Sequence, residues 1–251
     1  MNKVSVIIVT RNEEKNIRPC LNTVRWADEI VLVDQSSQDN TVSIAREFTD
    51  KIYVVDPKGY CEPDRITALE KASFDWILCI DADERIPEKL VDEIKLVVSS
   101  DDIKYDGYFI PRVNYIFGRQ MGYGGHKDDK QLRFFRKSRT ELSHKIHEPP
   151  IVRVNIGVLK NSMEHFSTNT LSEYCRKLNS YTDKEARRMR EEGVKFSVSQ
   201  IIINPAGKFI YQYIFQRGFM DGAEGFLFYS LSAFYIFLKH IKLWELCQKD
   251  G

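Results

Sequence analysis

The sequence is poor in cysteine, and its cysteines are far apart. They stand at Cys20, Cys61, Cys79, Cys175 and Cys247, so no two form the C-x-x-C pair that is typical of zinc or redox sites. An odd, widely spaced set argues against a disulfide framework and suits reduced thiols in a cytosolic protein. The start of the chain also lacks the apolar stretch and cleavage site of a secretory signal. We therefore expect a cytoplasmic protein.

An excess of charge of either sign is missing too. The chain has 37 Lys and Arg against 36 Asp and Glu, which gives a formal net charge of +1. Because there is no strong overall field to steer a polyanion, we do not expect nucleic acid as a partner. Long apolar runs are equally scarce. The longest uncharged run, residues 225–238, is shorter than the ~20 apolar residues that a spanning helix needs.

Two glycine-rich nucleotide motifs are absent. The first strand-like run, residues 3–9, is followed by Thr10-Arg11-Asn12-Glu13-Glu14, which is neither G-x-G-x-x-G nor G-x-x-x-x-G-K-[ST]. A dinucleotide fingerprint and a P-loop are therefore both missing. The sequence therefore has no motif that supports redox chemistry with a dinucleotide or hydrolysis of a nucleoside triphosphate.

An alternation of strand and helix patterns is what the first hundred residues do contain. Short β-branched runs are separated by stretches with helical spacing, and this order predicts right-handed βαβ crossovers and a parallel sheet. With 43% hydrophobic residues the chain can bury a substantial core. The expected strands are residues 3–9, 29–33, 51–55 and 76–80.

After Asp106 the pattern changes to an α+β continuation. Residues 108–113 and 132–135 read as strands, and glycines between them mark tight turns. Residues 171–192 have the apolar spacing of an amphipathic helix. We expect an α/β domain over residues 1–168, with a nucleotide-binding half at 1–100 and an acceptor-side half at 101–168. A helical extension over residues 169–251 follows it.

The C-terminal extension is rich in aromatic residues. Seven of the fifteen phenylalanines lie between residues 209 and 238, and basic residues follow at Lys239 and Lys242. This composition suits an interfacial helix pair that contacts a membrane surface through residues 209–242. It suits equally well aromatic residues that close the core or a homodimer interface.

The most informative stretch is the strand that ends in Asp81-Ala82-Asp83-Glu84. Ligands of open α/β sheets bind at the carboxyl ends of the strands. Two carboxylates there can hold a divalent cation, which in turn binds a diphosphate. The alternative is that these acids merely precede the next helix, where Pro87 suits the first turn and negative charge suits the N-terminus.

Polar loops follow the first two strands at the same edge. Residues 10–13 follow one strand, and Asp34, Ser36, Ser37 and Asp39 follow the other. Together with the acids they predict a crevice lined by three loops. A purely structural alternative exists for each loop, because Asn12 and Asp39 could be helix caps.

These motifs, in this order, resemble a known enzyme family. Val6-Ile-Ile-Val-Thr-Arg-Asn-Glu-Glu14, Ile30-Val-Leu-Val-Asp-Gln-Ser-Ser-Gln-Asp-Asn-Thr41 and Asp81-Ala-Asp-Glu84 look like the family 2 glycosyltransferases, which are inverting enzymes. The resemblance covers residues 1–100. It implies an α/β, GT-A (Rossmann-like) nucleotide-diphospho-sugar transferase fold with a mostly parallel central sheet, here with a helical, aromatic-rich C-terminal extension.

Shorter motifs in the second half resemble the bacterial lipopolysaccharide core β-glucosyltransferases. They are residues 129–137, His147-Glu148, Asp221-Gly222 and residues 242–245. The resemblance implies transfer of a sugar from a nucleotide sugar, UDP-linked by expectation, to a glycan or lipid-linked acceptor of the cell envelope. A sugar nucleotidyltransferase and a catalytically silent nucleotide-sugar-binding protein at the membrane are the alternatives.

The family pattern also implies roles for individual residues. The loop Thr10-Arg11-Asn12-Glu13 and Asp34 would surround the base and ribose, and Arg65 would lie near the nucleotide. Asp81 would lie by the ribose and the metal, with Asp83 as the direct ligand of Mg²⁺ or Mn²⁺. The second loop departs from the family pattern, because Gln35, Ser36, Gln38 and Asn40 replace small residues. Because glycines of the family pattern are missing here, the backbone of this loop has less conformational freedom, and the sequence does not predict the shape of the loop.

An inverting transfer needs a general base for the acceptor hydroxyl, while the metal stabilises the departing diphosphate. Asp129 and Glu148 are the candidates for the base. Asp128 stands where the branch commonly has proline. Arg133 and Arg136 could bind diphosphate oxygens, but residues three apart on a strand point to opposite faces. At most one of the two should reach the site, and Arg133 is our candidate.

Overall fold

The computed structural model describes residues 2–57, 62–100, 102, 104–141, 151–152, 155–168 and 170–248. The chain forms two compact units. The first contains Met1–Arg112 and Lys130–His165, and the second contains Val113–Asp129 and Phe166–Gly251. Residues 113–129 therefore group with the C-terminal helices, although the residues on both sides of them along the chain belong to the first unit.

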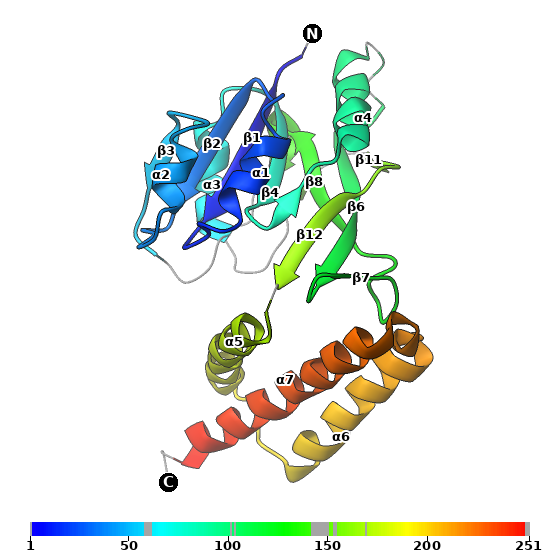
Figure 1. Ribbon diagram of the computed structural model, residues 1–251. Coiled ribbons are helices and arrows are strands. Elements are labelled where there is room, and N and C mark those ends of the chain that lie inside the picture. Colours follow the sequence, from blue (N-terminus) through cyan, green and yellow to red (C-terminus); the bar gives the residue numbers. More distant parts are fainter. Residues whose placement is uncertain are drawn as a thin grey trace. The chain divides into compact units, whose positions relative to one another are not determined.

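The first unit is built on a parallel sheet (Figure 1). Its strands β1 (Val4–Thr10), β2 (Glu29–Asp34), β3 (Ile52–Val54) and β4 (Trp76–Asp81) lie in the order β3-β2-β1-β4 and are all parallel. The parallel sheet predicted from the alternating pattern is confirmed. Because β1 is central and parallel to both neighbours, the carboxyl ends of β2, β1 and β4 lie side by side.

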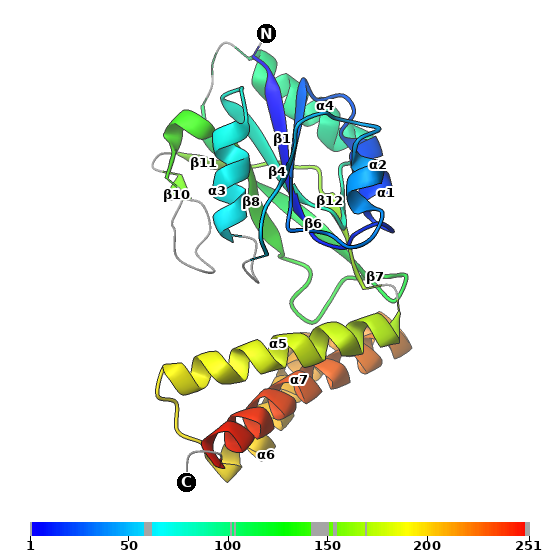
Figure 2. The same cartoon turned by 90° about the vertical axis from the view of Figure 1, so that its left-hand side faces the viewer.

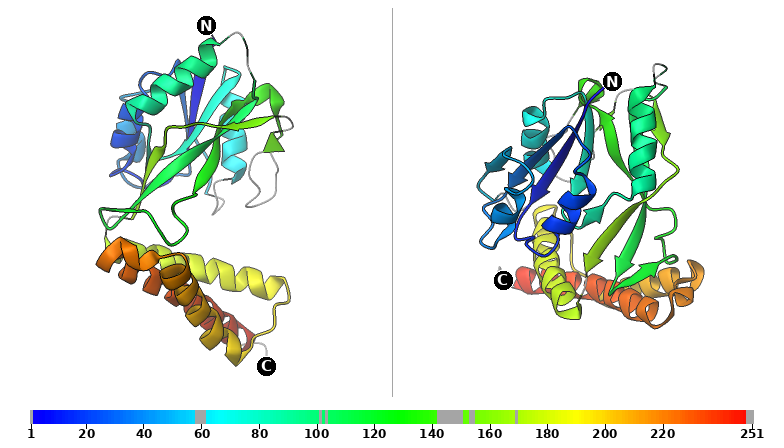
Figure 3. Two further views of the ribbon diagram at one scale, coloured as in Figure 1. Left: turned by 90° about the vertical axis from the view of Figure 1, so that its right-hand side faces the viewer. Right: turned by 45° about the horizontal axis from the view of Figure 1, so that its top comes forward.

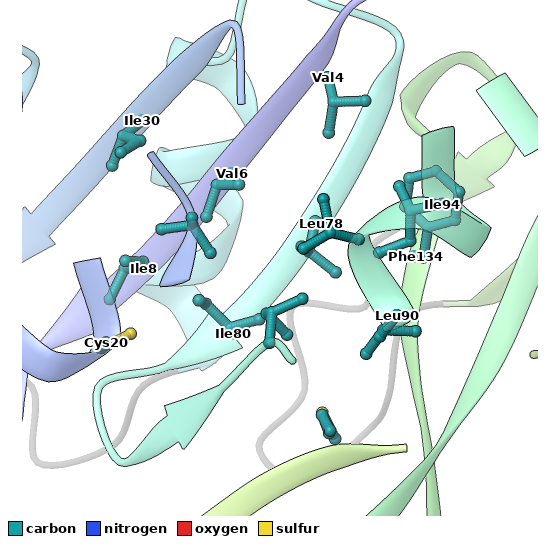
Figure 4. Packing of buried hydrophobic residues seen from close by; sticks show 14 of the residues in the cluster. Val4, Val6, Ile8, Cys20, Ile30, Leu78, Ile80, Leu90, Ile94 and Phe134 are labelled. Atoms are coloured by element: carbon teal, nitrogen blue, oxygen red, sulfur yellow. The ribbon is translucent and has the colours of Figure 1, made fainter. Parts of the chain in front are cut away.

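Helices cover both faces of this sheet, and the alternation of side chains along each strand decides which residue meets which helix. Val6, Ile8 and Leu32 pack with α1 (Ile17–Thr23), α2 (Thr41–Ala45) and α4 (Glu88–Ser99). Figure 4 shows part of this cluster, with side chains of the strands and of α4 directed toward one another. Ile7 and Val31 face the other way and pack against α3 (Glu62–Lys71). Burial on both faces explains why the strands read as continuous apolar runs.

Antiparallel strands extend the sheet beyond β4 (Figure 2). β8 (Lys130–Arg136) pairs antiparallel with β4, and β6 (Gly107–Ile116) pairs antiparallel with β8. The ring of Trp76 stacks on that of Phe134 with centroids 4.6 Å apart, which fixes β8 against β4. Both strands predicted after Asp106 are thus confirmed. The remaining short elements are β5 (Glu84–Arg85), β7 (Arg119–Met121), η1 (Lys137–Arg139), β9 (Thr140–Glu141), β10 (Ile151–Val152), β11 (Ile156–Val158) and β12 (Met163–Thr168).

The second unit is dominated by helices (Figure 3). They are α5 (Leu171–Glu191), α6 (Val198–Ile210) and α7 (Gly222–Gln248), with a π-helical turn at η2 (Tyr211–Phe215) and a 3₁₀ turn at η3 (Gly218–Asp221). Helix α7 packs against both α5 and α6. The amphipathic helix predicted over residues 171–192 is confirmed. The expectation that no segment is long enough to span a membrane, drawn from the uncharged run at residues 225–238, is wrong: the helical segment Gly218–Gln248 continues past its flanking charges and, by length and composition, is long and apolar enough to cross one.

Candidate functional site

Three strands deliver polar side chains to one edge of the sheet. In the register of the parallel pairs, Thr10 lies opposite Asp34 and Val9 lies opposite Asp81. Asp34 and Thr10 are both buried. Within the described part of the chain, the buried hydroxyl oxygen of Thr10 has no hydrogen-bond partner. An unsatisfied buried hydroxyl costs free energy, so this position at a strand end suits contact with a polar ligand.

The loops after β1 and β2 are hydrogen-bonded to each other. The backbone N–H of Asn12 donates to the hydroxyl of Ser37 at 2.8 Å, and the N–H of Gln38 donates to the side-chain oxygen of Asn12 at 2.8 Å. Asp34 accepts from the N–H of Ser37 at 2.7 Å. Asp39 accepts from the N–H of Thr41 at 3.0 Å, at the start of α2. Asp39 also accepts from the N–H of Glu14 at 3.1 Å, and the N-cap of α2 is Asn40. Asn12 and Asp39 therefore both connect the two loops, and neither is a helix N-cap.

Ser36 adopts a backbone conformation that is unusual for a residue with a side chain. Its φ is 53°, in the left-handed region that favours glycine. The Ser36 hydroxyl donates to the carbonyl of Val55 at 2.8 Å, which compensates part of the strain. The loop after β2 thus contains a left-handed residue although it has no glycine.

Asp81 lies between two arginines. The guanidinium of Arg65 donates to one carboxylate oxygen at 2.5 Å, and Arg133 pairs with the other oxygen. Burial alone would raise the pKa of this carboxyl, but Arg133 and Arg65 hold it well below its usual range. Asp81 is therefore ionised throughout the neutral range, and both its oxygens are engaged.

Glu84 completes the same charge cluster. Arg133 also donates to Glu84 at 2.9 Å, Arg112 lies 3.6 Å from it, and the N–H of Asp81 donates to its second oxygen at 2.9 Å. Burial raises the pKa of Glu84 against the pull of Arg133. Arg133 thus holds two acids together with one terminal nitrogen, while its Nε has no partner among the described residues. Arg136 instead pairs with Asp75 and Asp106.

Asp83 lies in the turn between β4 and β5. The helix that follows begins at Glu88, with Pro87 as its N-cap, so the alternative that Asp81 and Asp83 only precede a helix does not hold. The Asp83 side chain is 19% exposed, and its carboxylate lies 3.4 Å from Nε2 of His165. The sequence did not identify His165 as a partner, because the pairing of β12 with β5 that brings it there leaves no local pattern.

The donor set fits a hard cation at Asp83 better than at Asp81. Both side chains are partly exposed, 19% for Asp83 and 32% for Asp81, but both oxygens of Asp81 pair with guanidinium groups, whereas Asp83 lies beside the imidazole of His165. Among the residues that the structure describes, no group of three or more His, Cys, Asp or Glu could hold a metal ion. An ion at Asp83 would therefore need further oxygen ligands from a bound diphosphate or from water, as is usual for Mg²⁺.

Asp129 is oriented by a buried amide in the second unit. The side-chain nitrogen of Asn114 donates to its carboxylate at 2.8 Å. The adjacent Asp128 is exposed, so the two neighbouring acids have different surroundings. The other candidate base, Glu148, lies outside the described residues.

The structure brings Arg65, Asp81 and Arg133 together and places Arg11 at an exposed position after β1. Glu13 lies in the loop that Thr41 holds by a hydrogen bond of 2.8 Å.

A buried acid fixes the loop that leads to Asp129. Asp221 accepts from the N–H of Gly122 at 2.9 Å and from the N–H of Tyr123 at 3.2 Å. The hydroxyl of Tyr229 lies 2.8 Å from Asp221 and 2.9 Å from the carbonyl of Tyr123. Burial and Asp221 together raise the pKa of Tyr229, so its hydroxyl stays protonated. Asp221 and Tyr229 thus hold residues 122–124 from one side.

Comparison with known proteins gives a consistent result. Residues 5–160 match the sequence model of the family described as Glycosyl transferase family 2. An uncharacterised glycosyltransferase of Rickettsia typhi is 29% identical over 100% of this chain and 89% of the relative. The lipopolysaccharide core biosynthesis glycosyltransferase LpsC of Rhizobium meliloti is 29% identical over 96% of this chain and 92% of the relative.

A solved structure shows the same architecture. S. aureus TarS 1-349 in complex with UDP has a TM-score of 0.51 and 18% sequence identity, and the match covers 98% of this chain and 92% of that one. At this identity the likeness concerns the fold alone. The expected GT-A, Rossmann-like α/β fold with a mostly parallel sheet and a helical C-terminal part is confirmed.

Replacing Asp81 by asparagine tests the charge cluster. Asp81→Asn leaves the buried guanidinium of Arg133 and the half-buried one of Arg65 without their shared carboxylate, so the free energy of unfolding near neutral pH should fall by about 2–4 kcal/mol. Because the folded pKa of Asp81 is depressed, its stabilisation is present above its ordinary pKa and is lost as the pH falls through the folded value. Denaturant unfolding should show that the difference in free energy of unfolding between wild type and Asp81→Asn becomes smaller as the pH is lowered through the acid range. Asp92→Asn, at an exposed position, is the control. An equally large loss of stability in this variant would contradict the role assigned to Asp81 in the charge cluster.

Two glycines with similar backbone conformations test the fixed loop. A Cβ added at Gly124, with φ +62°, would lie 2.1 Å from the ring of Tyr229, whereas one added at Gly118, with φ +78°, meets nothing within 4 Å. Gly118→Ala should therefore cost only the left-handed backbone, about 1–2 kcal/mol. Gly124→Ala should cost about 1–3 kcal/mol more through overpacking. Equal losses in thermal unfolding would show that Tyr229 does not fix this loop.

Proposed function

The chain belongs to glycosyl transferase family 2 and is a glycosyltransferase that uses a nucleotide sugar; on that premise we propose that it transfers the sugar with inversion to a glycan of the cell envelope. The observation that carries the proposal is the convergence of Asp81, Arg65 and Arg133 at the carboxyl edge of the parallel sheet, beside Asp83. This is the edge where α/β sheets bind nucleotides.

The donor side of the proposal follows from the strand ends. Thr10 and Asp34 lie opposite each other, and the loop connected by Asn12 and Ser37 joins them. These groups offer carboxylate and hydroxyl oxygens for the ribose and base. UDP is the proposed nucleotide, and the complex of TarS with UDP supports it only as an analogy of fold. Arg11 and Glu13 flank the same loop, and their contacts with the donor remain predictions.

We propose that the departing diphosphate is stabilised by a divalent cation, Mg²⁺ or Mn²⁺, with Asp83 as its protein ligand. When bound, such a cation neutralises the charge that builds on the leaving group. The protein's own part is to hold Asp83 beside His165 and to keep Asp81 engaged by its two arginines. The unpartnered Nε of Arg133 is available, among the described residues, for a phosphate oxygen.

On the acceptor side, Asp129 is the proposed base. The amide of Asn114 donates to Asp129 and so orients the carboxylate that would take the proton of the acceptor hydroxyl. Glu148 remains the alternative. The name of LpsC supports lipopolysaccharide core as the class of acceptor. A nucleotide sugar as donor suits action on the cytoplasmic side, which is where we propose that the enzyme works.

Removal of the Asp83 carboxylate should abolish transfer. We expect Asp83→Ala to lower the rate at least about a hundredfold, because it removes the protein ligand of a cation that supplies several kcal/mol. The variant should also lose the rise in melting temperature that UDP-glucose with Mn²⁺ gives to wild type. The exposed Glu88→Gln should change neither. Normal turnover of Asp83→Ala with added Mn²⁺ would refute the role, and release of pyrophosphate in place of UDP would indicate a nucleotidyltransferase.

Two adjacent acids allow a matched test of the base. Asp129→Asn should lower kcat by about 10²–10⁴-fold and remove the acid limb of the pH-rate profile, because an amide cannot accept the proton. Asp128→Asn, at an exposed position, should keep the wild-type kcat and the acid limb of the pH-rate profile. If Asp129→Asn retains the wild-type profile, Glu148→Gln should show the loss instead. Wild-type rates in both variants would exclude both acids.

A further inference from the structure

The helical unit carries many exposed apolar residues on the consecutive segments α6, η2, η3 and the start of α7. None of the 13 residues of α6 is buried, although most are apolar. The exposed side chains continue through η2 and η3 into the first turns of α7. We define the apolar face by its exposed members: Val198, Ile202, Ile203, Ile210, Tyr211, Ile214, Phe215, Phe219, Met220, Phe226 and Leu227. We propose that this face binds the surface of a bilayer that contains anionic lipid.

The degree of exposure is what requires a partner. The side chain of Phe215 is 73% exposed and that of Ile203 is 65% exposed. Single exposed apolar residues are ordinary, but a contiguous set on neighbouring turns is typical of interaction sites. Other aromatic residues of this segment are used inside the unit. Tyr229 is fully buried, and Phe209 stacks on Tyr213 with centroids 5.0 Å apart. Phe219 and Phe226 contact the ring of Tyr213 edge-on and are still about half exposed, whereas Phe215 is the most exposed of these aromatic residues.

Charge favours a lipid surface over another apolar protein. Between residues 198 and 238 the charged residues are Lys208, Arg217, Asp221 and Glu224. Asp221 is buried, and Glu224 pairs with Arg119 at 2.7 Å. The charges left beside the apolar face are those of Lys208 and Arg217, both positive. Aromatic and aliphatic side chains with basic residues next to them match the headgroup region of an anionic membrane.

The contacts of α7 favour a position along the membrane, although the helix is long enough to cross it. Its C-terminal half packs on α5, where Lys242 donates to the hydroxyl of Thr182 at 2.8 Å and pairs with Asp183 at 2.7 Å. Helix α5 bears many charged side chains, which cannot enter the hydrocarbon without a large cost. A crossing α7 would have to leave α5. The apolar face alone therefore enters the interface, in the manner of a monotopic protein.

Flotation with lipid vesicles tests the proposal on the full chain. The protein should float with vesicles of equal parts phosphatidylcholine and phosphatidylglycerol, and less with phosphatidylcholine alone. The double variant Ile203→Ser, Phe215→Ser should lower the bound fraction roughly tenfold or more, because two large apolar side chains no longer enter the interface. Lys208→Gln with Arg217→Gln should lower binding only to the anionic vesicles, and added salt should weaken the wild type in the same way.

Matched controls separate membrane binding from misfolding. Leu96→Ser changes a side chain on α4 that is 71% exposed, and Lys89→Gln removes an exposed positive charge from the same helix. Both should float as wild type does, and donor hydrolysis should be unchanged in all these variants. Flotation of the double serine variant at the wild-type level would overturn the proposal. A second result would also overturn it: the wild type sediments as a dimer, the serine variant sediments as a monomer, and neither binds vesicles. The partner of the apolar face would then be a second copy of the chain.

Discussion

The interaction on which the first unit depends is the hydrogen-bonded pairing of Arg133 with Asp81 and Glu84. One buried guanidinium joins the last residue of a parallel strand to the short strand that follows it. Burial of a lone charge of either sign would be prohibitively costly, so each of the three groups is stable only because the others are present. The cluster therefore fixes the turn that presents Asp83, and the geometry of that turn follows from buried electrostatics more than from loop propensity.

This arrangement explains why the two acids of the Asp-Ala-Asp sequence differ. Asp81 belongs to the fold, since its oxygens are engaged by Arg65 and Arg133. Asp83, two residues later, lies beside the imidazole of His165, and its side chain is 19% exposed. A pair of acids that looks symmetrical in the sequence thus divides into one group that preserves the shape of the site and one that can meet a ligand.

The sequence predicts the strands well because they are buried on both faces, which produces apolar β-branched runs that exposed strands and loops do not have. It predicts the site's edge because the polar residues directly follow those runs. It does not predict His165 beside Asp83, or Arg112 beside Glu84, because both depend on pairing between strands that are distant along the chain. Nor does it predict that residues 113–129 group with the helices, since Asp221 and Tyr229 act on that segment from about a hundred residues away.

The strand β8 has a consequence for how the protein can be divided. The family resemblance is strongest in the first hundred residues, yet the arginine that neutralises Asp81 and Glu84 arrives on a strand that begins at Lys130. A fragment that ended at residue 100 would retain every motif of the nucleotide half but would leave one side of β4 without its neighbour. Asp81 would keep only Arg65, and Glu84 would lose both Arg133 and Arg112. Recognisable modules of sequence are here not separable modules of folding, and a chimaera that exchanges only the N-terminal half must import a compatible β8 with it.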